Sequence, residues 1–188
     1  MQFKQIKTPK LPPLDWNGPY EEQVFVAKEI GKKIVGYFVP YRYLYAYTTD
    51  KEWRGKLPFI PVGVSGLIRK GNQILFGKRG QNVTQYKGYW ETPPSGSITE
   101  GPEQLDPILH ILKELQEETG ITKALKVTPI REVLDRETGR LDLCFQIDVD
   151  QNPIPTDEYQ EFIWVNIGNS LDHLGENVVP LSRQLFHL

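Results

Sequence analysis

The sequence predicts a mixed α/β fold, because several β-rich segments of strand length surround one long helix with clear ends. The helix covers Pro107–Thr119; Asp106 is a suitable N-cap, and Gly120 is typical of the position just past a helix end. Strands combined with a packed helix form layered α/β or α+β folds around one core. The β-rich segments are 61–68, 73–79, 126–134, 140–149 and 161–167, and short helices are expected within 170–177 and 180–188.

Composition limits the function classes. The chain has 188 residues, which is long enough for one good core. Its net charge of −2 gives no broad basic surface for nucleic acid. No stable nucleic acid binding is therefore expected. The single Cys144 lies in an apolar run, where we expect a buried thiol in a reducing cytoplasm. No apolar segment reaches the length of a membrane span, so we expect no membrane partner.

The N-terminal part lacks the pattern of the rest. Residues 1–20 are rich in proline and lysine and resemble an extended arm. Residues 21–35 space apolar side chains as a helix does, whereas 36–49 place tyrosines at every second position, which favours a strand or an edge ribbon. We assign 1–58 to an N-terminal extension made of arm, helix and aromatic strand, and 59–188 to the main domain.

Two β-rich runs and the loop after them contain candidate binding residues. The runs 61–68 and 73–79 flank Gly71-Asn72 and read as a β-hairpin that ends at Arg79. The loop 80–104 is long, and long loops are often functional. Its aromatic side chains are suited either to stacking on a base or to pinning the loop; they are Tyr86, Tyr89 and Trp90.

The end of the long helix is unusually acidic. At about 100° per residue, Glu114, Glu117 and Glu118 share one arc, and apolar side chains share another. Glutamates in the last turn are repelled by the helix dipole, which favours cations there by about 0.3–1 kcal/mol per charge. A divalent cation reverses this repulsion, and carboxylate oxygens suit Mg²⁺ or Mn²⁺. The pattern predicts a metal site for a phosphate ester or anhydride, with a solvated acidic face as the alternative.

The segment KELQEETGI resembles the second half of the Nudix box, and every position from Glu114 onward matches. Lys113 stands in place of the family's arginine. The first half, which begins at Gly96, departs further, because Pro102 occupies the position of a glutamate, with Glu103 beside it. The interval between the halves is three residues longer than in the family, about one helical turn. The resemblance covers about 61–167.

The resemblance implies an α/β/α sandwich around a mixed β-sheet, and a Mg²⁺-dependent or Mn²⁺-dependent hydrolase that cleaves the pyrophosphate of a nucleoside diphosphate derivative. It implies metal ligands at Glu114, Glu117, Glu118 and the Gly96 carbonyl, catalysis by Glu117 or Glu118, and substrate binding by Arg79 and Lys113. For Arg79, a solvent-facing cation at a strand end is an equal alternative. Glu158 and Glu161 lie where the family often places another acid, and ordinary loop acids are the alternative.

Substrate identity stays open between nucleotide sugars, ADP-ribose, dinucleoside polyphosphates and oxidised nucleotides. The extended box resembles the branch of the family that splits UDP-sugars. A noncatalytic nucleotide-binding or regulatory module is the alternative function, favoured by the altered first half of the box. His110 is read as a plain helix-surface residue in preference to a proton carrier, and a homodimer paired through Tyr37–Tyr47 is compatible with the pattern.

Overall fold

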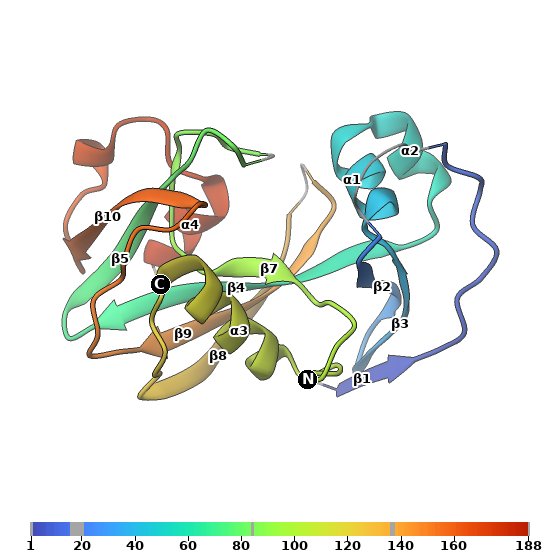
Figure 1. The fold of residues 1–188 in the computed structure, drawn as a ribbon, viewed down its shortest axis with the longest axis horizontal. Helices are drawn as coiled ribbons and strands as arrows, with labels where there is room; N and C mark the ends of the chain where they lie inside the picture. The colour runs from blue at the N-terminus through green and yellow to red at the C-terminus, as the bar shows by residue number, and fades with distance from the viewer. Residues whose placement is uncertain (1, 16–20, 84, 136–137, 188) are drawn as a thin grey trace. The chain divides into compact units, whose positions relative to one another are not determined.

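The computed structural model describes residues 2–15, 21–83, 85–135 and 138–187, and confirms the mixed α/β class (Figure 1). The helices are α1 (Tyr41–Thr49), α2 (Lys51–Lys56), α3 (Pro107–Thr119), the short 3₁₀ helix η1 (Asp172–Leu174) and α4 (Pro180–Phe186). The strands are β1 (Gln2–Gln5), β2 (Gln23–Ile30), β3 (Lys33–Pro40), β4 (Ile60–Lys70), β5 (Gln73–Arg79), β6 (Trp90–Glu91), β7 (Ser95–Ser97), β8 (Lys126–Leu134), β9 (Leu141–Asp148) and β10 (Tyr159–Asn166).

The chain forms two compact units. The first unit consists of Met1–Gly63, Ser97–His110 and Glu132–Asp142, and the second consists of Val64–Gly96, Ile111–Arg131 and Leu143–Leu188. Strand β4 and helix α3 contribute residues to both. The predicted division into 1–58 and 59–188 stays a prediction. None of the helices in the described ranges has the length and apolar character that a membrane crossing requires.

The first unit has a small mixed sheet. Strand β1 pairs parallel with β3, β3 pairs antiparallel with β2, and β2 pairs with the start of β4. The expected helix over 21–35 is therefore wrong, because this segment forms β2 and the beginning of β3. The physical reason is that the four consecutive residues Val24–Ala27 are all buried. A strand covered on both faces reads as a continuous apolar run, which periodicity alone does not separate from a helix.

The expectation for 36–49 is half correct. Strand β3 ends at Pro40, as expected of an aromatic strand, but Tyr41–Thr49 is the helix α1 and not a ribbon. Burial explains the helix, since its inward side chains follow helical spacing: Tyr43, Leu44, Ala46 and Tyr47. The ring of Tyr47 stacks on Phe59 with centroids 5.4 Å apart. Packing against the apolar core of the first unit therefore overrides the alternation of tyrosines.

Gly36 lies at a close backbone contact in this small sheet, and Gly36→Ala should destabilise the fold. A Cβ at Gly36 would lie 2.0 Å from the carbonyl oxygen of Val26 and 2.6 Å from the Phe25 ring. Overpacking of this kind costs about 1–3 kcal/mol. Urea unfolding should show a lower midpoint for Gly36→Ala than for the matched control Gly31→Ala, whose Cβ meets nothing within 4 Å. Equal midpoints would contradict this account.

The second unit contains the predicted hairpin and most of the predicted strands. Strands β4 and β5 pair through Arg69 with Ile74 and Lys70 with Gln73, and Gly71 takes a positive φ of 58° at the turn. Strand β5 pairs with β10 on one side and with β6 on the other. The strands expected over 126–134, 140–149 and 161–167 are confirmed, as are both short C-terminal helices and the burial of Cys144.

The C-terminal segment is hydrogen-bonded to β6. The amide of Trp90 donates to the carbonyl of Asn177 at 2.8 Å, and Val179 donates back to Trp90 at 2.9 Å. The buried hydroxyl of Ser182 on α4 accepts from the amide of Thr92 at 2.9 Å. Hydrogen bonds with the C-terminal segment therefore fix Trp90 and Thr92, the residues on both sides of Glu91.

Helix α3 has the predicted ends. The carboxylate of Asp106 accepts from the amide of Ile108 at 2.9 Å, and Gly120 takes a φ of 68° while its amide donates to Gln116 at 2.9 Å. His110 is a correction, because its side chain is 0% exposed and not on the helix surface. The preceding loop covers it, and its Nε2 lies 2.8 Å from the carbonyl oxygen of Gln104.

Candidate active site

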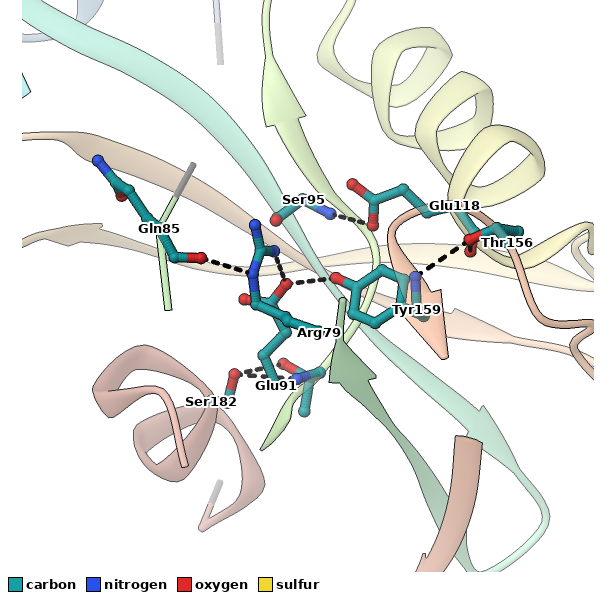
Figure 2. Close-up of polar contacts among 9 residues, drawn as sticks. Arg79, Gln85, Glu91, Ser95, Glu118, Thr156, Tyr159 and Ser182 are labelled. Carbon is teal, nitrogen blue, oxygen red and sulfur yellow. Dashed lines mark hydrogen bonds and ion pairs between the residues drawn. The ribbon is translucent and has the colours of Figure 1, made fainter. Parts of the chain in front are cut away.

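The three glutamates of the acidic helix end have different environments. Glu117 is exposed, Glu114 is half-buried, and Glu118 is only 3% exposed. The amide of Ser95 donates to a carboxylate oxygen of Glu118 at 3.1 Å, so the loop that carries β7 meets the last turn of α3 here (Figure 2). The hydroxyl of Thr156 donates to the Glu118 carbonyl at 2.9 Å, which satisfies one carbonyl at the helix end.

Gly96 lies against Glu114. A Cβ built on Gly96 would be 2.1 Å from Oε1 of Glu114 and 2.3 Å from its carboxyl carbon. Only a glycine allows this approach without moving the carboxylate. The structure thus brings together two residues that the sequence selected as metal ligands, one through its backbone and one through its side chain.

Glu118 is the electrostatic centre of the acidic group. Burial raises its pKa well above the ordinary value, and the nearby carboxylates of Glu158, Glu114 and Glu91 raise it further, while the Ser95 amide opposes the shift. Partial removal from water also raises the pKa of Glu158; Arg79 lowers it, and Glu91 and Glu117 raise it. The acids therefore lie close enough to disfavour one another's charge.

Arg79 is held inside the second unit by a cluster that spans three adjacent strands. Its Nη1 forms an ion pair with Glu91 on β6, and the hydroxyl of Tyr159 on β10 donates to the same Glu91 oxygen (Figure 2). Its Nε donates to the carbonyl of Gln85 at 3.0 Å. The Arg79 side chain is 13% exposed, so the solvent-facing alternative is wrong.

The charge of Arg79 is retained despite burial. Burial lowers its pKa, but Glu91, Tyr159 and Glu118 outweigh this effect, and the pKa rises. Burial raises the pKa of Tyr159 well above its ordinary value, and Glu118 and Glu91 add to the shift. The tyrosine is therefore a neutral donor, and the guanidinium is a fixed positive charge within range of the acidic group.

Comparison with known proteins gives structural matches only. No family model matches the chain, and no curated protein matches its sequence. The Nudix domain of NrtR from Shewanella oneidensis, solved with ADP-ribose, superposes with a TM-score of 0.56 at 16% identity, over 74% of this chain and 95% of that one. A bifunctional NMN adenylyltransferase/ADP-ribose pyrophosphatase from Francisella tularensis, solved with AMP and a manganese ion, gives 0.56 at 21% identity, over 78% and 45%.

A MutT protein from Methanosarcina mazei gives a TM-score of 0.50 at 25% identity, over 68% of this chain and 89% of that one. This chain has the Nudix fold. The resemblance that the acidic helix predicted is therefore confirmed for the fold.

The remaining predicted residues differ in burial and in their contacts. Lys113 is half-buried on α3 and forms no ion pair with any residue that the structure describes. Glu161 is exposed on β10, whereas Glu158 belongs to the acidic group. The rings of Tyr86 and Tyr89 are 5.5 Å apart and tilted by 55°, so these two form a pair with each other.

Glu91 is the residue that sequence reasoning missed. It is buried on the two-residue strand β6, where it accepts from both Arg79 and Tyr159. Its position in the Nudix fold depends on strand pairing between distant segments, since Glu91 lies opposite Gly77 on β5. The one available signal was an acid directly after Trp90, between two turn-rich stretches of the loop.

The donor set suits a divalent cation chemically. Carboxylates and a backbone carbonyl are the oxygen ligands that Mg²⁺ and Mn²⁺ prefer, and the repulsion focused on Glu118 would be relieved by a cation. Within the described ranges, no group of three or more His, Cys, Asp or Glu side chains is arranged to hold one ion. Mg²⁺ commonly keeps several positions for water and substrate phosphate, so one or two carboxylates with the Gly96 carbonyl are a fitting protein share.

Proposed function

We propose that this chain is a Mg²⁺-dependent or Mn²⁺-dependent hydrolase that cleaves the pyrophosphate of a nucleoside diphosphate linked to another moiety. One observation carries the proposal: Glu118 is buried at the end of α3, and three further carboxylates act on its pKa. A buried acid among other acids is unfavourable for stability. Such an arrangement is typical of a site that works with a cation and an anionic substrate.

The residues have separate roles in this proposal. Glu114, Glu118 and the Gly96 carbonyl hold the cation, which supplies charge stabilisation at the phosphate oxygens when bound. The Ser95 amide fixes the Glu118 carboxylate. Glu117, which is exposed, accepts the proton of the attacking water. The water oxygen bonds to one phosphorus, the bond from that phosphorus to the bridging oxygen breaks, and two phosphate monoesters leave.

The comparisons support particular members of a substrate panel. The Shewanella domain was solved with ADP-ribose, and the Francisella protein is described as an ADP-ribose pyrophosphatase. ADP-ribose therefore joins UDP-glucose and UDP-galactose, which the extended box suggests. Dinucleoside polyphosphates and oxidised nucleoside triphosphates complete the panel.

The test is a hydrolysis screen of this panel with Mg²⁺ or Mn²⁺, with EDTA as the control, that follows release of nucleoside monophosphate. We expect metal-dependent turnover of at least one nucleoside diphosphate derivative. Calorimetry with the same compounds distinguishes the alternative, because binding without turnover would identify a noncatalytic nucleotide-binding module. Neither turnover nor binding across the panel would overturn both functions.

A further inference from the structure

Arg79, Glu91 and Tyr159 form a buried cluster that the proposed metal chemistry does not use. They lie on three neighbouring strands, because β5 pairs with β6 on one side and with β10 on the other. Gly77 leaves room for the cluster, since a Cβ there would lie 2.5 Å from the Tyr159 ring. Strand side chains alternate between faces, so Gly77 and Arg79 share a face.

Two of the three nitrogens of the Arg79 guanidinium are fixed. Nη1 is paired with Glu91 and Nε with the carbonyl of Gln85, while Nη2 forms no hydrogen bond with any residue in the described part of the chain. Figure 2 shows this third nitrogen pointing away from both partners. A guanidinium that is held at two nitrogens and open at the third is suited to an incoming oxygen.

Tyr159 connects this cluster to the acidic helix end. Its hydroxyl donates to Glu91, and its amide donates to the hydroxyl of Thr156 at 3.3 Å. The same Thr156 hydroxyl donates to the carbonyl of Glu118. A short series of hydrogen bonds thus runs from the guanidinium partner to the last turn of α3.

We propose that Glu91 and Tyr159 are positioning residues that clamp Arg79, so that its Nη2 binds a phosphate oxygen of a nucleoside diphosphate. The substrate class rests on the proposed function. Glu91 holds Nη1 while the Gln85 carbonyl holds Nε, so the guanidinium is fixed at two nitrogens and the N–H groups of Nη2 are left for an anion. Glu91 also pairs the buried positive charge, which keeps Arg79 inside the fold when no substrate is present.

The experiment is a double-mutant cycle on ADP affinity, measured by calorimetry with ADP and Mg²⁺. Arg79→Ala should weaken ADP binding by about tenfold or more, because a hydrogen bond to a charged group is lost. Tyr159→Phe should weaken it by about threefold to tenfold while keeping the ring. In the Arg79→Ala background, Tyr159→Phe should have no further effect, because the tyrosine acts through the arginine.

Two controls separate positioning from a structural role. Tyr43→Phe removes another tyrosine hydrogen bond, from the hydroxyl to the Pro12 carbonyl at 3.0 Å in the first unit, and should leave ADP affinity unchanged. Arg79→Lys should not restore affinity, because an ammonium group cannot be held along two edges. Inorganic pyrophosphate as a second probe should reproduce the pattern, since the clamp recognises phosphate and not the base.

The outcomes also separate this proposal from the proposed hydrolase activity. If Tyr159→Phe weakens ADP binding equally with and without Arg79, the clamp is overturned. Tight ADP binding by Arg79→Ala, or no binding of ADP and pyrophosphate by the wild-type protein, would overturn it too. If the wild-type protein binds ADP, shows the expected cycle and hydrolyses nothing in the panel, the hydrolase proposal fails and the clamp stands.

Discussion

Replacing Glu118 by glutamine should abolish nearly all turnover and yet make the metal-free protein more stable. The amide keeps the size of the side chain and an oxygen that accepts from the Ser95 amide. It removes the charge that the cation needs, and we expect turnover to fall by about 10²–10⁴-fold. It also removes a buried carboxylate whose ionised form is disfavoured by burial and by three other acids. Steady-state kinetics and thermal unfolding in EDTA measure both effects.

The sign of the stability effect depends on pH. Because the pKa of Glu118 is raised in the folded protein, the folded protein keeps this proton when the unfolded chain has already released it. The contribution of Glu118 protonation to the free energy of unfolding is thus fully present below the ordinary glutamate pKa. It is lost as the pH rises through the pKa that Glu118 has in the folded protein. Wild type and Glu118→Gln should have similar stability at about pH 4, and the variant should gain its advantage toward neutral pH.

Glu117→Gln is the matched comparison. Glu117 is exposed, so its replacement should change the free energy of unfolding by no more than about 0.5 kcal/mol while turnover still falls steeply. Mg²⁺ should stabilise the wild-type protein more than it stabilises Glu118→Gln, because the cation offsets the buried charge. A Glu118→Gln protein with unchanged turnover, or one that melts lower than wild type in EDTA near neutral pH, would refute the assignment of Glu118.

Gly96→Ala should reduce turnover by about 10²-fold without unfolding the protein. The added Cβ would occupy the position of the Glu114 carboxylate, 2.1 Å from Oε1. The flexible side chain of Glu114 can swing away, so the expected damage is to the geometry of the site rather than to the core. A displacement of about 1 Å in a catalytic site is enough for a loss of this size. Kinetics at saturating substrate and a titration of Mg²⁺ measure the effect.

Gly55→Ala is the control for the glycine experiment. Gly55 lies on the exposed side of α2, and a Cβ there meets nothing within 4 Å. Its turnover should equal that of the wild type, and alanine should favour the helix by up to about 1 kcal/mol. Equal turnover for Gly96→Ala and Gly55→Ala would show that the contact between Gly96 and Glu114 has no part in activity.

Local signals predicted one part of the fold well. Helix α3 carries its own end markers in Asp106 and Gly120, and the hairpin of β4 and β5 carries its turn in Gly71. Such features depend on residues close in sequence, so they are visible without a structure. The prediction for the N-terminal segment was wrong because its structure depends on residues far away in the sequence. Burial on both faces of β2 and aromatic packing around α1 come from distant residues, which local periodicity does not report.

The residues of the candidate site also fall into those that local signals predict and those that only the structure shows. Glu114, Glu117 and Glu118 were selected because helical spacing and position at the helix end are readable along the chain. Glu91 was missed, because its contacts with Arg79 and Tyr159 exist only once β6, β5 and β10 are paired. For Arg79, the sequence indicated a cation at a strand end. Its buried partner Glu91, which fixes the direction of the guanidinium, lies in a segment of turn-like composition.

The contact between Ser182 and Thr92 bears on biosynthesis. During translation, the acidic helix and the strand that carries Glu91 leave the ribosome long before the residue that secures Thr92 has been made. Until Ser182 has been added, the nascent chain therefore has every predicted metal ligand but lacks this buried hydrogen bond. The site should therefore take its final form only after α4 has been synthesised, however early the sheet assembles.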